Sequence, residues 1–387
     1  MCPSRKLMAM ISMTVVFIAC LGCQLLPEHV SDEEPDTFGL WEVGHKSFTA
    51  IDNARDNRSL RVGVWYPVDA DQANWGFLAT YPLLGPLGLT ADIAMIGKPV
   101  STLPDRNLIV FSHGYGGTNT QSTPLMEMLA SHGFIVVAPE HTGNAQSSPT
   151  DSFDQAAENR VPDVSFVIDT MLARNDEPSD CFYERLDELH VGVVGHSFGG
   201  MTAIGTAAGW AGAEADPRVT AIAPISAVID ATLQSEPRDS PYAGFNEEQL
   251  SGIDVPVMLI GGTEDTNVPI ENNALAFDLI PAPVYKVDII GATHTHFANV
   301  CAIGDWLIHD LHIDMNMWGL IGAGDLTQPY LDTCTGDVFP IAEAIRLQNL
   351  YVVAFLKRHL QGLAEYDPYL TVSYAQDNEP DVDFSKK

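Results

Sequence analysis

The chain has 387 residues, enough to bury a full hydrophobic core, and its 46% hydrophobic and 18% charged content excludes a disordered protein. Its 51 acidic residues against 19 Lys and Arg give a net charge of −32, which repels phosphate backbones and excludes nucleic acid as an expected partner. The acidic residues are spread along the chain rather than gathered in a tail, which is typical of a solubilising surface.

The N-terminus has the pattern of an export signal. A basic pair precedes an apolar stretch over residues 7–22, which is too short for a comfortable membrane span, and the stretch ends at Cys23. This pattern resembles a bacterial lipoprotein signal, in which a cysteine is lipidated and becomes the mature N-terminus; Cys20 is a second choice for that cysteine. We therefore assign residues 1–23 to a lipoprotein-type signal peptide. We expect an exported protein, held in the cell envelope (periplasm or outer membrane) through an N-terminal lipid or secreted; an uncleaved anchor is a further alternative.

A short acidic segment follows the signal. Residues 24–37 contain two prolines and several acids, which predicts a flexible, solvated linker. We expect residues 38–387 to form a single domain, because no internal repeat or low-complexity segment interrupts them.

The cysteines outside the signal number three, and export implies an oxidising compartment. They are Cys181, Cys301 and Cys334. The simplest expectation for three cysteines is one disulfide and one free thiol, and we favour the Cys301–Cys334 pair for the disulfide. Three buried thiols are the alternative. No group of Cys and His has the spacing of a zinc site, so no metal is expected.

Strand and helix patterns alternate along the domain. The sequence predicts strands over residues 37–52, 59–68, 107–112, 134–138, 190–194, 219–225, 255–261 and 284–290, the first two antiparallel. It predicts helices over residues 121–132, 161–173, 199–209, 273–279 and 342–360. This alternation indicates an α/β domain with a mostly parallel central sheet and helices on both faces.

Two longer segments do not fit the alternation. They cover residues 227–254 and 297–340, and both follow strands of the predicted sheet. Because binding loops gather at the carboxyl ends of parallel strands, we expect both to form a cap or rim over a site. Surface decoration is the alternative.

The most informative motif is Gly195-His196-Ser197-Phe198-Gly199. It follows a predicted buried strand and precedes a helix of small residues, which is the order that builds a nucleophile elbow. In such an elbow the serine hydroxyl is exposed on a tight strand-to-helix turn. Ser197 is therefore the expected nucleophile.

A serine nucleophile needs a base, and the base needs an acid to fix its tautomer. Asp265 follows the strand predicted over 255–261, with Glu264 as a substitute. His294 follows the next strand, and periodicity alone does not separate it from His296. The order serine, acid, histidine along the chain is that of an α/β-hydrolase triad.

The oxyanion formed during acyl transfer needs preformed donors. The amide of Phe198, directly after the nucleophile, is one expected donor. The glycine-rich loop after residue 112 should supply the second, most simply the amide of Tyr115.

Further motifs extend the pattern over most of the domain. They read Val64-Trp65-Tyr66-Pro67, Phe111-Ser112-His113-Gly114-Tyr115-Gly116-Gly117, Ala138-Pro139-Glu140-His141, Gly195-His196-Ser197-Phe198-Gly199-Gly200 and Gly291-Ala292-Thr293-His294. Together they resemble the α/β-hydrolase superfamily, and more narrowly the bacterial dienelactone-hydrolase-like and platelet-activating-factor-acetylhydrolase-like esterases. The resemblance implies nucleophile, acid and base roles for Ser197, Asp265 and His294, and it favours His294 over His296. True dienelactone hydrolases use a cysteine nucleophile, so their substrate is not transferred to this chain.

The expected activity is hydrolysis of carboxylic esters with short or uncharged acyl groups, through an acyl-enzyme and without a cofactor or metal. The expected partner is a small-molecule ester, and no protein partner is predicted. A peptidase or amidase on the same fold, and a non-catalytic binding protein that retains the scaffold, are the alternatives.

Overall fold

The computed structural model describes residues 33–70, 76–281 and 283–387, so the predicted signal peptide, with Cys20 and Cys23, lies outside the described residues. The described residues form one compact unit that begins at Glu33. The Glu33 carboxylate lies 3.1 Å from the ammonium group of buried Lys357 and accepts a hydrogen bond from the amide of Leu40. Because a buried ammonium group needs a partner, residues 33–37 belong to the folded domain and not to the linker expected over 24–37.

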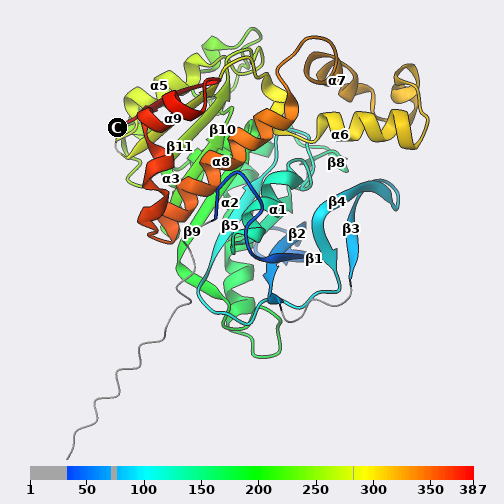
Figure 1. Cartoon of the computed structure of the whole chain (residues 1–387), viewed down its shortest axis with the longest axis vertical. Helices are drawn as coiled ribbons and strands as arrows, with labels where there is room; N and C mark the ends of the chain where they lie inside the picture. The colour runs from blue at the N-terminus through cyan, green and yellow to red at the C-terminus, as the bar shows by residue number, and fades with distance from the viewer. Residues whose placement is uncertain (1–32, 71–75, 282) are drawn as a thin grey trace, which may run out of the picture. The chain divides into compact units, whose positions relative to one another are not determined.

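The domain is built on an 11-stranded sheet (Figure 1). Its strands are β1 (Glu42–Asp52), β2 (Arg58–Val68), β3 (Phe77–Leu84), β4 (Leu87–Ile96), β5 (Arg106–Ser112), β6 (Ile135–Glu140), β9 (Leu186–His196), β10 (Val219–Ile225), β11 (Val257–Gly262), β12 (Val284–Ile289) and β13 (Val382–Lys386). They lie side by side in the order β13-β12-β11-β10-β9-β5-β6-β2-β1-β4-β3. The short strands β7 (Asn144–Ala145) and β8 (Ser148–Pro149) pair separately.

The centre of the sheet is parallel and its ends are mixed. β6, β5, β9, β10, β11 and β12 pair in parallel, whereas β1–β2, β2–β6, β3–β4 and β12–β13 pair antiparallel. The carboxyl ends of the six parallel strands therefore lie along one edge, where binding residues gather in such sheets. The predicted antiparallel pair at the start of the domain is present as β1 and β2.

Helices cover both faces of the sheet. They are α1 (Thr123–Ser131), α2 (Phe153–Asn175), α3 (Phe198–Ala208), α4 (Glu247–Ser251), α5 (Glu271–Leu279), α6 (Val300–Asp305), α7 (Thr327–Cys334), α8 (Ile341–Leu360) and α9 (Val372–Asn378). Alternate residues of each central strand enter different cores, as the pleat requires: Ile109 of β5 packs with α1 and α8, and its neighbour Val110 packs with α2 and α3. This arrangement is the α/β-hydrolase fold, as expected.

The two segments outside the regular alternation differ in where they lie. Residues 234–238 of the first line the main cavity, as a cap would, but no described residue of 297–340 does. The second segment instead forms a small core of its own around fully buried Trp318, which Leu84 of the β3–β4 hairpin joins. The expectation that both segments cap the site is therefore correct for the first and wrong for the second.

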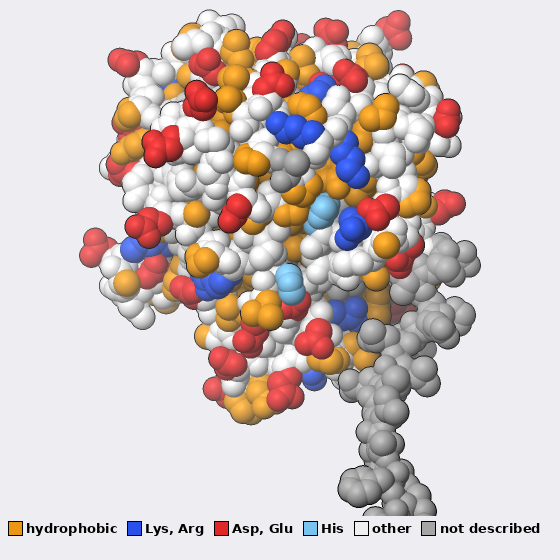
Figure 2. Space-filling view, turned by 90° about the vertical axis from the view of Figure 1, so that its left-hand side faces the viewer, with side chains coloured by type: hydrophobic (Ala, Val, Ile, Leu, Met, Phe, Trp, Pro, Cys, Tyr) orange, Lys and Arg blue, Asp and Glu red, His pale blue; other side chains and the backbone are white. Residues whose placement is uncertain are grey.

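The cysteines and the surface charge follow the sequence. Cys301 of α6 and Cys334 of α7 form the expected disulfide, and Cys181 is free and exposed. Figure 2 shows Asp and Glu side chains spread over one face without gathering into a patch. No helix within residues 33–70, 76–281 and 283–387 is both long and apolar enough to cross a membrane.

Candidate active site

Ser197 occupies a sharp turn between β9 and α3. Its backbone has φ +59° and ψ −119°, a conformation that L-residues rarely adopt. Its amide donates to the carbonyl of Ile225 at the end of β10, at 2.8 Å. The strained turn lifts the hydroxyl away from the sheet edge, as in the expected nucleophile elbow.

Two glycines make this turn sterically possible. A Cβ on Gly199 would lie 1.8 Å from the carbonyl oxygen of Ser112, and one on Gly195 would lie 2.1 Å from the carbonyl oxygen of Gly199. Real Cβ atoms do not approach so closely. The glycines of the motif are therefore required by the close approach of β9, β5 and α3.

His294 and Asp265 meet on neighbouring loops. His294 begins the 3-10 turn η3 (His294–Phe297) after β12, and Asp265 lies on the loop after β11. Because β11 and β12 pair in parallel, their loops emerge together. The Nδ1 of His294 lies 2.7 Å from Oδ2 of Asp265. Since an ionised carboxylate only accepts, this nitrogen carries the proton and Nε2 is left free to accept one.

Asp265 is held ionised by its surroundings. Its side chain is buried, and burial alone would raise its pKa. The positive charge that His294 carries when protonated, the hydrogen bond from its Nδ1 and the hydrogen bond from the amide of Val268 outweigh burial and hold the pKa of Asp265 below its usual value. The amides of Asn267 and Val268 donate to Oδ1 at 2.9 and 2.7 Å. The substitute, Glu264, is exposed and does not take this place.

The alternative histidine, His296, forms hydrogen bonds away from the cavity. Its Nδ1 accepts from the amide of Thr293 at 2.9 Å and its Nε2 donates to the carbonyl of Phe339 at 2.8 Å. The side chain is fully buried, which lowers its pKa. Both ring nitrogens are therefore used within the fold.

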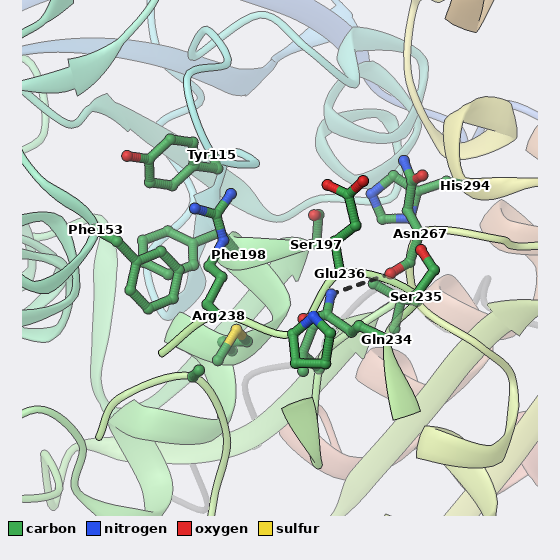
Figure 3. Close-up of a pocket in the computed structure, with 15 residues that line it drawn as sticks. Tyr115, Phe153, Ser197, Phe198, Gln234, Ser235, Glu236, Arg238, Asn267 and His294 are labelled. Atoms are coloured by element: carbon green, nitrogen blue, oxygen red, sulfur yellow. Dashed lines mark hydrogen bonds between the residues drawn. The ribbon is translucent and has the colours of Figure 1, made fainter. Parts of the chain in front are cut away.

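Ser197 and His294 line one open cavity of about 610 Å³ (Figure 3). Within the described part of the chain, no hydrogen bond joins the Ser197 hydroxyl to the His294 ring. Such bonds are often long in ligand-free sites and tighten with substrate. The structure thus brings the three residues of the predicted triad to one place, with the Asp–His bond already formed.

A chain of hydrogen bonds ties the histidine loop to the loop after β5. The carbonyl of His294 accepts from Nε2 of His196 at 2.9 Å, and Nδ1 of His196 accepts from the Gln121 amide group at 2.7 Å. The oxygen of that amide accepts from the Gly114 amide at 2.9 Å. Burial lowers the pKa of His196 to about 3, so the ring is neutral, as this chain of bonds requires.

The two expected oxyanion donors lie beside Ser197. Phe198 is the first residue of α3, so its amide has no earlier carbonyl to bind within the helix. Tyr115 lines the same cavity as Ser197, and a Cβ on its neighbour Gly114 would lie 3.5 Å from the Cβ of Ser197. Both amides therefore border the nucleophile.

Several residues of the site were missed from the sequence. Phe153 and Arg238 line the cavity, and the Arg238 guanidinium lies about 5 Å from the ring centres of Tyr115 and Phe153. Phe153 lies at the start of a helix and Arg238 lies in an irregular loop. Neither sequence pattern indicates that the side chain faces a site. Buried Arg160 carried a signal, because it and Asp163 are charged residues among inward-facing apolar positions of α2 such as Val164.

No set of three His, Cys, Asp or Glu side chains in the described ranges is arranged to hold a metal ion. The His309–His312 stretch, which could suggest a metal site by composition, forms none.

A family model named Chlorophyllase matches residues 94–311, more than half of the chain. The matched region contains Tyr115, Ser197, Asp265 and His294. The chain belongs to the chlorophyllase family.

Other relatives of this chlorophyllase-family protein carry different names. It is 25% identical over 189 residues to Cutinase 2 of Thermobifida cellulosilytica, which covers 48% of this chain and 59% of that protein. It is 28% identical over 191 residues to Cutinase est1 of Thermobifida alba, which covers 49% of this chain and 53% of that one. The match thus spans little more than half the length of these relatives.

Among solved structures, the fold is similar to that of a ferulic acid esterase from Streptomyces cinnamoneus. The TM-score is 0.61 at 25% identity, with 89% of this chain and 96% of the other covered. The likeness therefore extends over nearly the whole of the described domain.

Proposed function

We propose that this protein is a serine hydrolase that cleaves carboxylic esters through an acyl-enzyme. The observation that carries the proposal is the strained Ser197 elbow at the same cavity as His294, whose Nδ1 is already bound to buried Asp265. The names of the relatives, cutinase and ferulic acid esterase, support the same class of substrate.

The proposed mechanism has two steps, acylation and deacylation, and the same side chains and amides serve both. His294 accepts the proton of Ser197 as the hydroxyl attacks the ester carbonyl, and Asp265 stabilises the imidazolium that forms. The amides of Tyr115 and Phe198 bind the oxyanion. His294 then protonates the departing alcohol, and a water molecule, deprotonated by His294, hydrolyses the acyl-enzyme.

The apolar part of the cavity supports an uncharged or aromatic acyl group, and Glu236 and Arg238 are charged residues of the remaining lining. The apolar lining includes the Tyr115 and Phe153 rings, stacked at 6.0 Å between centroids, together with Met201, Val228 and Val268. A volume of about 610 Å³ is within the range that holds a small-molecule ligand. We propose short-chain and aryl esters as substrates, and the finer kinship with dienelactone-hydrolase-like and acetylhydrolase-like esterases remains part of this proposal.

The test is a series of 4-nitrophenyl esters of increasing acyl length, run beside aminoacyl anilides on the purified domain. Ester cleavage that exceeds anilide cleavage supports the proposal. Faster anilide cleavage would replace it with an amidase. Absence of both activities, in a folded protein that a fluorophosphonate fails to label, would identify a binding protein.

We also propose that the chain is exported with a lipid on Cys23. The support is the sequence of residues 1–23 alone. Expression of the full chain in a bacterium with radiolabelled palmitate should label the protein, and the Cys23→Ser variant should lose the label. If Cys20→Ser loses the label and Cys23→Ser keeps it, Cys20 is the processed residue; a protein never labelled is not a lipoprotein.

A further inference from the structure

A fully buried arginine lies directly behind the loop that carries Tyr115. Arg160 extends from α2, and none of its surface is exposed. One terminal nitrogen donates to the hydroxyl of Ser112 and to the carbonyl of His113, and the other donates to the carbonyl of Gly114 at 3.0 Å and to the side-chain oxygen of Asn144 at 2.6 Å. A buried cation is costly, so its partners indicate what it holds in place.

The Gly114 carbonyl is the most heavily bonded of these partners. Besides Arg160, the amide of Gly117 donates to it at 3.1 Å, which closes a turn in which Gly116 has φ +67°. His113 is the third donor, with Nδ1 2.8 Å from the same oxygen. Its Nε2 accepts from the amide of His141 at 3.1 Å, so the proton of the neutral ring must be on Nδ1. Three donors thus fix one oxygen.

Fixing that oxygen also fixes the amide of Tyr115. The two belong to the same planar peptide group, and in a trans peptide the carbonyl and the N–H point in opposite directions. Because the Gly114 carbonyl points to the buried guanidinium, the Tyr115 N–H points away from it. A Cβ on Gly114 would lie 3.5 Å from the Cβ of Ser197, so this peptide group adjoins the nucleophile, and we infer that its N–H is directed to the space where a substrate oxyanion would form.

The other expected donor, the amide of Phe198, is oriented in a different way, although Arg160 also contacts Phe198. The Ser197 carbonyl accepts from the amide of Met201 at 3.1 Å, so the first turn of α3 orients the Phe198 amide. The guanidinium of Arg160 lies 4.9 Å from the centre of the Phe198 ring. Helix α3 therefore holds one donor, and the other depends on a side chain.

We propose that Arg160 is the positioning residue of the oxyanion hole: its guanidinium, together with the His113 ring, holds the Gly114–Tyr115 peptide so that the Tyr115 amide binds the oxyanion. The cation also polarises that peptide, which strengthens its N–H as a donor. Burial lowers the pKa of Arg160 to about 9, so the side chain is still protonated at neutral pH. This inference rests on the ester hydrolysis proposed above.

The test compares Arg160→Lys with the parent protein, using a trifluoromethyl ketone of the preferred acyl length. The Ser197 oxygen bonds to the ketone carbon, its proton passes to His294, and the carbonyl oxygen becomes an oxyanion. In the variant we expect kcat to fall about 10- to 100-fold, the inhibition constant to rise by a similar factor, and KM to change less than about 3-fold. An inhibition constant does not depend on how much of the sample is active.

The matched control is Arg58→Lys. Arg58 belongs to the same buried network, through Asp163 and the carbonyl of Thr142, but it bonds to no atom of the 113–117 loop. Its variant should keep the inhibition constant of the parent. If Arg160→Lys lowers kcat while the inhibition constant stays unchanged, the role of Arg160 is structural and the inference is wrong.

A second variant decides the matter if Arg160→Lys does not fold. His113→Phe keeps a ring of similar size and removes the other side-chain donor to the Gly114 carbonyl. It should raise the inhibition constant in the same direction, and an unchanged constant would overturn the inference. A parent protein that neither cleaves esters nor binds the ketone would instead refute the proposed function.

Discussion

Among the described residues, two sets of one serine, one histidine and one aspartate lie close together, and solvent exposure distinguishes them. Besides the proposed triad, the Ser112 hydroxyl lies 3.0 Å from Nε2 of His141, whose Nδ1 lies 2.9 Å from Asp163. All three side chains of this second set are buried to within 1% of their surface, and the Arg160 guanidinium also occupies the Ser112 oxygen. No ester reaches such a serine. This explains His141, for which the sequence suggested no catalytic role.

This contrast predicts where a covalent inhibitor reacts. A fluorophosphonate should label the peptide that contains Ser197 and leave Ser112 unmodified, because Ser197 lines the cavity and Ser112 does not. Peptide mapping by mass spectrometry measures the site. Ser197→Ala should abolish labelling and lower kcat by several orders of magnitude with the fold intact. Label on Ser112 in folded protein would contradict the assignment.

The carboxylate of Asp265 is predicted to act in two ways: its charge stabilises the imidazolium form of His294, and its hydrogen bond sets the tautomer of that ring. Asp265→Asn keeps an oxygen for the amides of Asn267 and Val268, so the loop should stay in place. The side-chain amide cannot stabilise a positive imidazole, and kcat should fall by about 10³- to 10⁴-fold. Steady-state kinetics with near-UV circular dichroism as the folding control check this, and Glu264→Gln is the matched variant expected to keep activity.

At the scale of single elements, the strands that the sequence predicted best are those that are buried on both faces of the sheet. Each of β5, β9, β10, β11 and β12 contains a stretch of buried, mostly apolar residues, and each was expected within a few residues of its observed bounds. The β3–β4 hairpin was missed, because it lies at the sheet edge and its exposed Phe77 and Leu87 blur the alternation. The segment over 297–340 was misplaced, because a local pattern shows where a loop leaves the sheet but not what it packs against.

The disulfide belongs to this same segment and should stabilise it locally. Closing a loop with a sequence separation of 33 is worth about 3–4 kcal/mol in the chain-entropy model. The Cys301→Ser/Cys334→Ser double variant should be cleaved by a protease within residues 301–334 well before the rest of the domain. Limited proteolysis with mass spectrometry locates the cuts. Cuts that appear first in the central sheet would show that the bond acts globally.

The candidate site itself was only partly predictable. Ser197, Asp265 and His294 were expected from the motifs and their chain order, because chemistry restricts the residue types that can serve. The position of Arg160 behind the oxyanion loop was not, since it follows from how α2 packs on β5 and β6. Amide donors such as that of Tyr115 leave no side-chain signature, and only the turn around them identifies them.

At the scale of the whole molecule, buried neutral histidines should control stability in mild acid. Burial lowers the pKa of His45, His141 and His359 to about 4, against an ordinary value of 6.5. The unfolded chain therefore binds more protons than the folded one between these values. The free energy of unfolding should be constant above pH 7 and fall as the pH decreases from about 6.5 toward 4.

Urea unfolding at a series of pH values measures this slope. His359→Gln should reduce it, because His359 is partly buried against Tyr285 and lies outside the candidate site. Each pKa unit by which a histidine is depressed contributes about 1.4 kcal/mol. A midpoint that does not move between pH 7 and pH 5 would contradict the prediction.

The bonds that run from Gly114 through Gln121 and His196 to His294 have a consequence for how substrate is received. They join the loop that contains Tyr115 to the loop that contains His294 through the side chains of Gln121 and His196, neither of which lines the cavity. Neither loop can move outward alone without breaking one of these partly buried hydrogen bonds. The two loops that carry the proposed catalytic groups are thus held together before any ligand binds.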